Sequence, residues 1–565
     1  MQIHEAFCTD VLVIGGGGAG ARAAIEASRY GVDVTLVADC LFGKGGLTVT
    51  GMGGFNVALG NVDRGDNWEV HFNDTVRGGF FLNNQKLAEI LVKEAPDRIY
   101  DLEDFGMTFN RTEEGKIGQR IESGSTYHRT CLSEDRTGHE MMSTLVNEVL
   151  RRDVRIFEET FVSGLLTNNG QIAGAVSLDF KHGNIILFRA GAVVIATGGS
   201  GRLFRVTSNP VESIGAGMAM AFQAGAELID MEMTQFHPTG MVYPESAKGI
   251  LVSEGVRGDG GILLNKNKER FMTRFDSKKM ELSTRDVVSR AIHTEIKEGR
   301  GTEHGGVYLD ISHVPASEIE RKLPTMLAQL LRAGVDIRKE PMEVAPTGHF
   351  HCGGVKIDEK TRSSVPGLFA CGEGAGGVHG ANRLGANSFP TLQVFGARAG
   401  KFAAEHATRN GKREVDYNQV ERECEKILQP IKQDKGVSPI LVRKKIQSLM
   451  QDNVGIVRNR QGLESAIHQL KEIKAKEVPK LYVKNHHNKY DLEWIEALRV
   501  QKMVELGLII AKAALLRTES RGVHFREDYP QSDNGNWLKN IIVKLENGEV
   551  SLRSQPIVIT LLRPN

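Results

Sequence analysis

The strongest constraint on the fold is an apolar run that ends in a glycine-rich turn. Residues 11–14 (VLVI) lead into GGGGAGARAA, where Gly15, Gly17 and Gly20 have the spacing G-x-G-x-x-G. Glycine here permits a tight turn, close approach of the backbone to a pyrophosphate and close packing of the following helix. A second apolar run at 32–37 completes a β-α-β unit of about 30 residues. The pattern predicts a Rossmann-like domain that binds a dinucleotide.

Two later apolar runs also end in glycines, at 191–201 (GAVVIATGGSG) and 367–377 (GLFACGEGAGG). Three such turns, far apart in the chain, predict one extended nucleotide site built from separate segments, which favours FAD over a nicotinamide cofactor. The segment 385–390 predicts the start of a helix whose positive end would face a flavin, although an ordinary capped helix has the same pattern. The expected cofactor-binding residues are Gly15, Gly17, Gly20, Asp39, Thr197, Gly198, Glu373, Asn387 and Ser388.

The ribose contact stays open at this stage. An acidic residue at the end of the second strand of such a unit binds a ribose hydroxyl. Asp39 lies close to that place, but Ala38 occupies the usual position.

The remaining segments predict an α/β protein with an inserted domain. The stretch 240–345 interrupts the glycine turns and mixes short strands with helices, such as one over 318–334. From residue 415 the apolar positions recur with the helical period of 3.6 residues, and from 529 turns and strands return. The predicted units are a Rossmann-like FAD-binding domain (1–239 and 346–410), an inserted α+β domain (240–345), a C-terminal helical bundle (415–528) and a small tail (529–565).

Composition excludes several classes of function. The chain has 71 Lys and Arg against 70 Asp and Glu, so a generally basic nucleic-acid binder or an acidic disordered chain is not expected. No apolar run reaches the roughly 18 residues of a membrane span. The six cysteines form no C-x-x-C pair, and scattered cysteines fit a reducing compartment. The N-terminus lacks a signal-peptide pattern, so we expect the cytoplasm, with attachment to the inner face of a membrane through partner subunits as an option.

Many segments together resemble the flavoprotein subunits of succinate dehydrogenase and fumarate reductase and the related L-aspartate oxidases. They are VLVIGGGGAGARAA, GGFNVALGN, HRTCLSEDRTGHEM, ATGGSGRLF, GMAMAFQAGAELIDMEMTQFHPTG, SEGVRGDGGILLN, RDVVSRAI, EIKEGRG, GHFHCGG, GEGAGGVHGANRLGANS and RTESRGVHFREDYP. They follow the family's order over almost the whole chain. The resemblance implies that the inserted domain is a capping domain, that Gly53 and Gly54 belong to the FAD site, and that an iron–sulfur subunit supplies electrons.

Two positions depart from the family pattern. Leu47 stands where many members have a histidine that is joined covalently to the flavin. Leucine has no nucleophile, so we expect noncovalent FAD, and this favours fumarate reduction over succinate oxidation. Ala216 stands where the family usually has aspartate, and nothing in the sequence explains that change.

The resemblance also implies a C4-dicarboxylate site. His349 and Arg383 would hold one carboxylate, and His237 and Ser253 the other. Hydride from the reduced flavin would reach one alkene carbon, and Arg285 would protonate its neighbour. Because the pKa of arginine exceeds about 12, this acid needs a relay, for which Glu254 and Arg257 match the family. Without the motifs, these three residues would be assigned to a structural ion-pair network.

Two other functions remain alternatives at the level of sequence. Glu122 falls where aspartate oxidases place a carboxylate near the substrate ammonium, and Cys352 also resembles that branch. The segments EIKEGRG, GDGGILLN and NRLGANS resemble the reductase branch. A non-enzymatic flavin-binding subunit is disfavoured, since Arg285, His237, His349 and Arg383 are intact. The electron donor (a thiol, a quinol or a ferredoxin) is left open.

Overall fold

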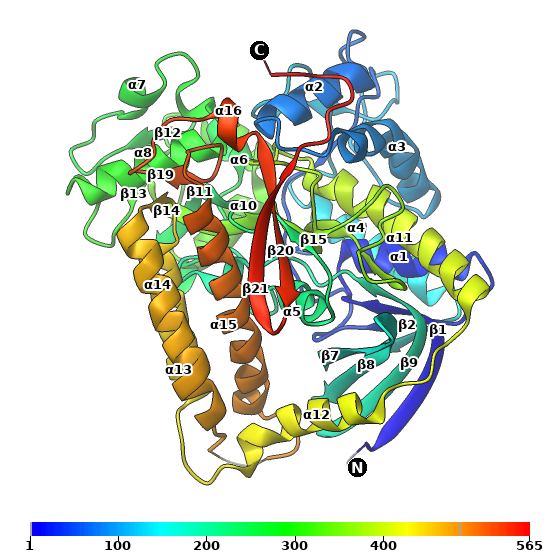
Figure 1. The fold of residues 1–565 in the computed structure, drawn as a ribbon. Coiled ribbons are helices and arrows are strands. Elements are labelled where there is room, and N and C mark those ends of the chain that lie inside the picture. The colour runs from blue at the N-terminus through cyan, green and yellow to red at the C-terminus, as the bar shows by residue number, and fades with distance from the viewer. Residues whose placement is uncertain (1–2, 485–486, 565) are drawn as a thin grey trace.

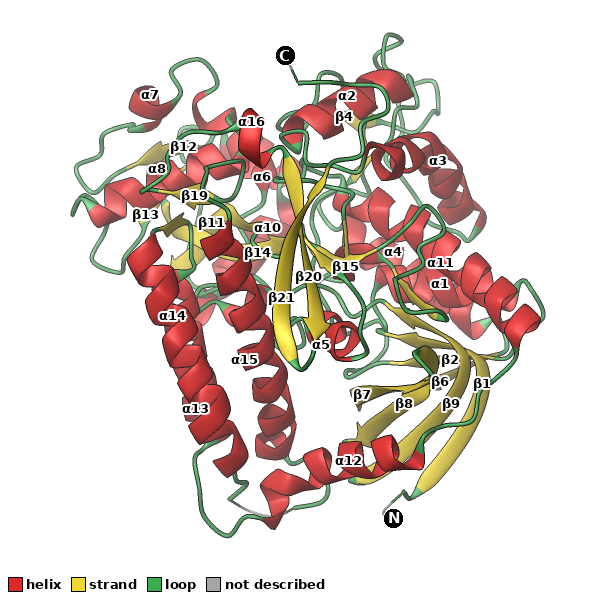
Figure 2. Cartoon of the chain, viewed as in Figure 1, coloured by secondary structure: helices red, strands yellow, loops and turns green. Residues whose placement is uncertain are grey.

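The computed structural model describes residues 3–484 and 487–564, and a seven-stranded sheet organises its first half (Figures 1 and 2). The order is β6-β2-β1-β9-β8-β7, with β16 paired to β9. All pairs among β6, β2, β1, β9 and β16 are parallel, and β7 and β8 add an antiparallel arm. The strands are β1 (Glu5–Ile14), β2 (Val34–Val37), β6 (Val154–Phe157), β7 (Thr160–Asn168), β8 (Gln171–Asp179), β9 (Asn184–Ile195) and β16 (Leu368–Ala370).

The glycine turn joins β1 to helix α1 (Gly18–Ser28), and two of its glycines, Gly15 and Gly20, leave no room for a side chain. Gly15 has φ +116°, and a Cβ there would lie 2.3 Å from the Ala196 carbonyl oxygen. A Cβ on Gly20 would lie 1.8 Å from the Gly15 carbonyl oxygen. Only glycine therefore lets α1 begin this close to the sheet. Helix α1 packs against α11 (Ser388–Asn410) and α4 (Thr137–Leu150), and α11 also packs against α3 (Gln85–Asp104).

A second body, called the capping body below, is green at the upper left of Figure 1. It holds its own hydrophobic core, whose residues lie between Met241 and Val344. Its antiparallel sheet has the order β11-β14-β13-β12. The predicted helix over 318–334 is two helices, because Leu323 precedes Pro324 and a residue before proline disfavours helical geometry. The elements are β11 (Thr234–Tyr243), β12 (Ile262–Leu264), β13 (Val307–Asp310), β14 (Met342–His351), α6 (Glu254–Gly258), α7 (Met272–Phe275), α8 (Arg285–Lys297), α9 (Ala316–Lys322) and α10 (Pro324–Arg332).

The C-terminal helices do not form one bundle. Helices α13 (Pro439–Asn453), α14 (Arg460–Glu472) and α15 (Leu492–Leu516) pack against each other, whereas α12 (Tyr417–Leu428) packs on β7 and β8 of the first sheet. Figure 1 shows α12 lying across the end of that sheet, away from α13 and α14. Helix periodicity predicts that a helix has an apolar face but does not say which element that face covers.

The tail forms a hairpin that joins a third sheet. Strands β20 (Lys539–Glu546) and β21 (Glu549–Pro556) are linked by Asn547 and Gly548, both with positive φ, as an Asn-Gly turn predicts. This sheet has the order β17-β15-β10-β20-β21. The remaining elements are α2 (Trp68–Gly78), α5 (Ala216–Gln223), α16 (Asn534–Trp537), β3 (Phe55–Asn56), β4 (Gln119–Arg120), β5 (Thr130–Cys131), β10 (Leu228–Ile229), β15 (Gly354–Lys356), β17 (Ala375–Gly376), β18 (Val457–Arg458) and β19 (Phe525–Arg526).

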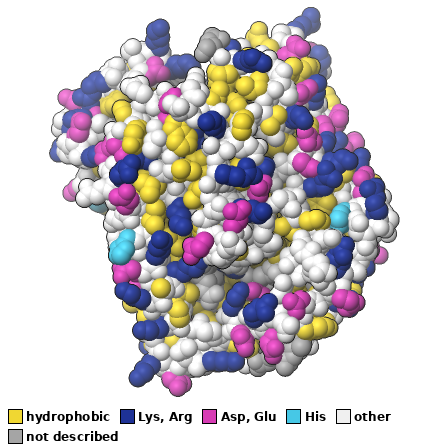
Figure 3. All heavy atoms as spheres, viewed as in Figure 1, with side chains coloured by type: hydrophobic (Ala, Val, Ile, Leu, Met, Phe, Trp, Pro, Cys, Tyr) yellow, Lys and Arg dark blue, Asp and Glu magenta, His cyan; other side chains and the backbone are white. Residues whose placement is uncertain are grey.

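The surface carries charges of both signs. On the face in Figure 3, basic and acidic side chains are interspersed rather than gathered by sign. Within the described ranges, no helix combines the length and the apolar character needed to cross a bilayer.

Candidate active site

One cavity of about 460 Å³ runs from the glycine turn after β1 to the capping body. Its walls come from the first sheet, from the loop 45–54, from β11 and β14, and from the segment that leads into α11. The cavity therefore joins the predicted nucleotide site to the predicted dicarboxylate site.

The nucleotide end fits a dinucleotide phosphate. Helix α1 opens at Gly17 without a side-chain cap from that residue. The Gly18 N–H donates to Thr48 Oγ1 at 3.3 Å. Gly17, Gly18 and Ala19 line the cavity, so the positive end of the helix faces it and favours an anion there. The absence of side chains at the turn lets a pyrophosphate approach the backbone. Of the predicted cofactor residues, those that line the cavity are Gly15, Gly17, Asp39, Gly53, Gly54, Thr197, Gly198, Glu373 and Ser388.

Two predicted cofactor residues do not line the cavity. Gly20 serves the close packing of α1 on the turn. The Asn387 side chain faces a buried polar network, in which it accepts a hydrogen bond from Asn56 at 3.0 Å and donates one to Thr75 at 2.9 Å. The backbone at the start of α11 still borders the cavity through Ala386 and Ser388.

Asp39 lines the cavity, and Ala38 is buried outside its lining. Burial raises the pKa of the Asp39 carboxyl to about 6, and Arg499 of α15 opposes this shift from 3.4 Å. The geometry thus leaves a carboxylate, rather than the Ala38 methyl group, beside the space where a ribose would lie.

Glu373 belongs to the third glycine turn and faces strand β14. Its Oε1 accepts the backbone N–H of His351 at 2.8 Å, and burial raises the pKa of the carboxyl to about 7. A carboxyl in this environment can act as acceptor or donor toward a sugar or ribityl hydroxyl.

The substrate end is assembled from separate elements. His237 and His349 come from the paired strands β11 and β14, and their rings lie 5.2 Å apart. Ser253 precedes α6 and makes no capping hydrogen bond to it. Arg285 begins α8. Arg383 lies in the loop before α11, with its guanidinium 4.6 Å from the centre of the Phe350 ring.

Glu254 is the centre of the charge network. Its Oε2 accepts hydrogen bonds from Arg285 Nη2 at 2.7 Å and Nε at 3.1 Å, and its Oε1 lies 3.6 Å from Arg257 Nη2. Burial alone would raise the pKa of Glu254, but Arg285 and Arg257 outweigh burial and hold the pKa below its usual value. Arg257 does not line the cavity and lies behind Glu254, with Nη1 bonded to the Glu281 carbonyl oxygen at 2.5 Å.

The two histidines are neutral. Burial lowers the pKa of each well below its ordinary value. Arg285 lowers the pKa of His237 further, and His237 and then Arg285 lower that of His349 further. Nδ1 of His237 accepts the Thr239 backbone N–H at 3.3 Å, so the ring proton resides on Nε2. Nδ1 of His349 is hydrogen-bonded to Ser208 Oγ at 3.0 Å.

Glu122 lines the cavity but already has a partner. Its Oε1 accepts hydrogen bonds from Arg120 Nε at 2.8 Å and Nη2 at 2.5 Å. Burial raises the pKa of the Glu122 carboxyl, and Arg120 opposes that shift. Arg120 was not among the predicted site residues, although it lies two positions before Glu122 and also lines the cavity.

Gln235 is the second residue that the sequence predictions missed. It is fully buried on β11, two positions before His237, and its Oε1 contacts both Arg285 and Arg383. The QFHPTG segment carried the signal, since residues two apart on a strand face the same side.

Leu47 and Ala216 both line the cavity. The loop with Leu47 offers no nucleophile at that position. Nothing in the structure explains Ala216.

Comparisons with known proteins cover nearly the whole chain. Residues 10–389 match a family described as FAD binding domain, and residues 443–565 match one described as fumarate reductase flavoprotein C-term. The chain is 48% identical over 543 residues to a subunit of the fumarate reductase (CoM/CoB) of Methanothermobacter marburgensis, covering 95% of this chain and 97% of that protein.

Two solved structures are similar in fold. The structure of Mycobacterium smegmatis Sdh1 with UQ1 aligns with a TM-score of 0.89 at 44% identity, covering 99% of this chain and 96% of that one. A mutated FrdA chain of E. coli quinol fumarate reductase aligns with a TM-score of 0.94 at 32% identity, covering 99% and 98%.

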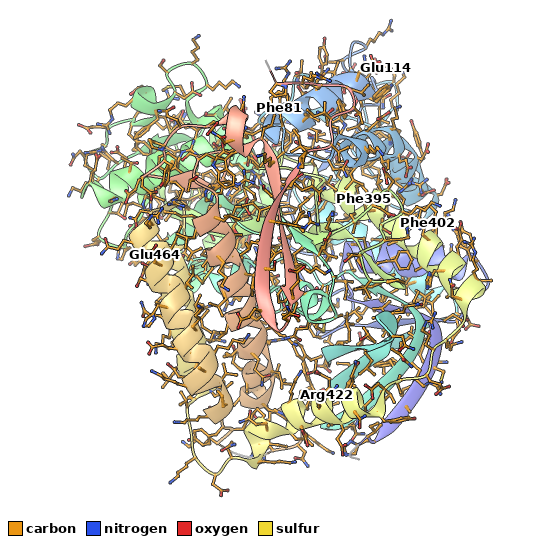
Figure 4. All side chains as sticks on the ribbon, in the orientation of Figure 1. Phe81, Glu114, Phe395, Phe402, Arg422 and Glu464 are labelled. Atoms are coloured by element: carbon orange, nitrogen blue, oxygen red, sulfur yellow. The ribbon has the colours of Figure 1, made fainter. Side chains whose placement is uncertain are left out.

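Glu373 makes stability depend on pH in protein freed of its cofactor. The folded chain holds this proton up to a pH of about 7, whereas an ordinary glutamate loses it near 4.5. Stability therefore falls as pH rises through this window, by at most about 3 kcal/mol. Glutamine at this position cannot titrate. The melting temperature of Glu373→Gln minus that of the wild type should therefore increase as the pH is raised from about 5 to 8. Glu464→Gln, at an exposed position on α14 (Figure 4), is the control; an equal response of both variants would contradict the assignment.

Proposed function

The chain belongs to the family of fumarate reductase and succinate dehydrogenase flavoprotein subunits, and we propose that it reduces fumarate to succinate. It is an FAD-dependent oxidoreductase that acts on CH–CH groups.

The observation that carries the proposal is a charge excess at the substrate end. This end of the cavity has four guanidinium groups but two carboxylates, and its two histidines are neutral. The guanidinium groups are those of Arg120, Arg257, Arg285 and Arg383, and the carboxylates are those of Glu122 and Glu254. The excess of two positive charges matches the two carboxylates of a dianion.

We assign the two ends of the substrate by position. Arg383 and His349 hold one carboxylate, and His237 and Ser253 hold the other. A guanidinium can donate two parallel hydrogen bonds to a carboxylate. These contacts also draw electron density from the alkene, which makes it a better hydride acceptor. Bound FAD, when reduced, supplies the hydride.

Arg285 supplies the proton in this proposal. It lies in the cavity wall and contacts Glu254 through two nitrogens. After it gives a proton to the carbon next to the one that takes hydride, Glu254 returns a proton to it. Arg257, on the far side of Glu254, is the next member of the relay.

The Glu122–Arg120 pair supports fumarate over L-aspartate. An amino-acid substrate would bring an ammonium group to Glu122, where it would compete with a guanidinium already bound at 2.5 Å and 2.8 Å. Fumarate carries no such group. L-aspartate oxidation is the alternative that the experiment below decides.

The partner and the location are also part of the proposal. No group of histidines, cysteines and carboxylates in the described part of the chain is arranged to hold a metal ion, and the relative from Methanothermobacter is named as one subunit of its enzyme. An iron–sulfur subunit would then deliver the electrons, in the cytoplasm or on the inner face of the membrane. The name of that relative makes CoM/CoB the first donor to test.

An anaerobic absorbance spectrum of the FAD-loaded protein tests the function. L-aspartate should leave the flavin band unchanged, because Arg120 already bonds Oε1 of Glu122. After the flavin has been reduced with dithionite, fumarate should restore the band. The amount of succinate formed should equal the amount of flavin that is reoxidised. Bleaching of the flavin band by L-aspartate would overturn the proposal in favour of an L-aspartate oxidase. A reduced flavin that fumarate does not reoxidise would overturn both hypotheses.

Arg285→Lys tests the acid. Lysine keeps a positive charge but cannot reach Glu254 through two nitrogens, so turnover with fumarate should fall about 10³-fold while FAD stays bound. Arg274→Lys is the matched control, since the half-exposed Arg274 pairs with the buried Glu295 in the same body and does not line the cavity. Turnover of Arg285→Lys within a few-fold of the wild type would remove the acid assignment.

Acid precipitation tests the noncovalent cofactor. With Leu47 in the loop that faces the cavity, all flavin should stay in the supernatant when the protein is precipitated. Flavin that remains with the pellet, seen by its fluorescence after proteolysis, would refute this prediction.

A further inference from the structure

Gln235 lies between the two arginines to which the proposed reaction assigns different tasks. Its Oε1 accepts a hydrogen bond from Arg285 Nη1 at 3.3 Å and one from Arg383 Nη2 at 3.4 Å. One neutral oxygen therefore contacts both the proposed proton donor and the proposed carboxylate clamp.

The orientation of this amide is fixed from its other end. Nε2 donates to Asn382 Oδ1 at 2.5 Å and to the Arg383 carbonyl oxygen at 2.9 Å. Asn382 in turn donates to Asp286, the neighbour of Arg285, at 3.4 Å. Guanidinium groups only donate, so the oxygen of Gln235 must be the atom that faces them.

The two cations repel each other. Burial lowers the pKa of Arg383 to about 9, and the charge of Arg285 contributes to that shift. A shared acceptor attracts both groups and so opposes their separation. It also holds the Arg285 end that is not bonded to Glu254, which limits how the guanidinium can turn.

We propose that Gln235 is a positioning residue, whose amide oxygen sets the spacing and the orientation of Arg285 relative to Arg383. The inference rests on the proposed function, because it assigns the two arginines their roles. It goes beyond that function by naming the group that keeps Arg285 and Arg383 at the spacing one substrate molecule needs.

The neutrality of the amide matters as much as its oxygen. A carboxylate at this position would cancel one of the two excess positive charges and compete with the substrate for both guanidinium groups. An apolar side chain of similar size would remove the acceptor that the two guanidinium groups share and leave Glu254 to oppose their repulsion without it.

Two variants and a substrate analogue test the proposal. Q235L removes the acceptor, and Q235E keeps the shape and an acceptor but adds a charge. Malonate, a dicarboxylate without an alkene, reports binding without turnover through the shift of the flavin absorbance band. Both variants should retain FAD, bind malonate about 10- to 100-fold more weakly and lose kcat by a similar factor.

The control is T347V on the paired strand, where Thr347 lies opposite His237 and contacts neither arginine. It should retain FAD, malonate affinity and kcat. Malonate affinity and kcat at the wild-type level in Q235L, or in Q235E if Q235L does not fold, would overturn the proposal. So would loss of FAD from both variants but not from T347V, because Gln235 would then serve the fold.

The two hypotheses fail in different ways. Wild-type protein that binds malonate but does not reduce fumarate would refute the proposed reaction, while malonate binding by the variants would still test the placement of the arginines. Wild-type protein that reduces fumarate, together with unimpaired variants, would refute only the role of Gln235.

Discussion

The substrate end depends on keeping four guanidinium groups together around two carboxylates, three of the four in the cavity wall and Arg257 behind Glu254. Like charges about 4 Å apart in a protein cost roughly 4 kcal/mol, and burial removes the water that would otherwise screen them. Glu254 offsets much of this cost, because it contacts both Arg285 and Arg257. In the proposed function an anionic substrate neutralises the remaining positive excess, so the imbalance that costs stability would also favour that ligand.

The framework resists this repulsion by anchoring each charge in a different element. Arg285 begins α8, Glu254 begins α6, and Arg383 belongs to the loop before α11. The strands β11 and β14 carry both histidines and Gln235, and they pair with each other over most of their length. The backbone positions of these charges are therefore fixed by the packing of several separate segments.

The sequence predicted the parts of this protein that depend on local pattern. The turn at Gly15 and Gly20 follows from its spacing, and the Asn547–Gly548 hairpin follows from its turn residues. The packing of α12 on β7 and β8 did not follow, since its pattern shows a face but not the partner of that face. The arginines of the site were predicted only through resemblance, because one charged residue in a sequence does not identify its ionic partner. Gln235 was missed although it lies two positions before His237, because its contacts are with arginines 50 and 148 positions away along the chain.

Two bodies of the fold enclose the cavity, and each contributes different residues of the site. The FAD-binding half provides Arg383 and the nucleotide wall, whereas the capping body provides Arg285, Glu254 and Arg257. Strands β11 and β14 cross the border between them. If the two bodies moved apart, Arg383 would stay with the nucleotide wall of the cavity. Arg285, the proposed proton donor, would move away from it together with Glu254 and Arg257. In the proposed reaction, hydride transfer and proton transfer to one substrate therefore both require the two bodies to stay packed along the shared strands β11 and β14.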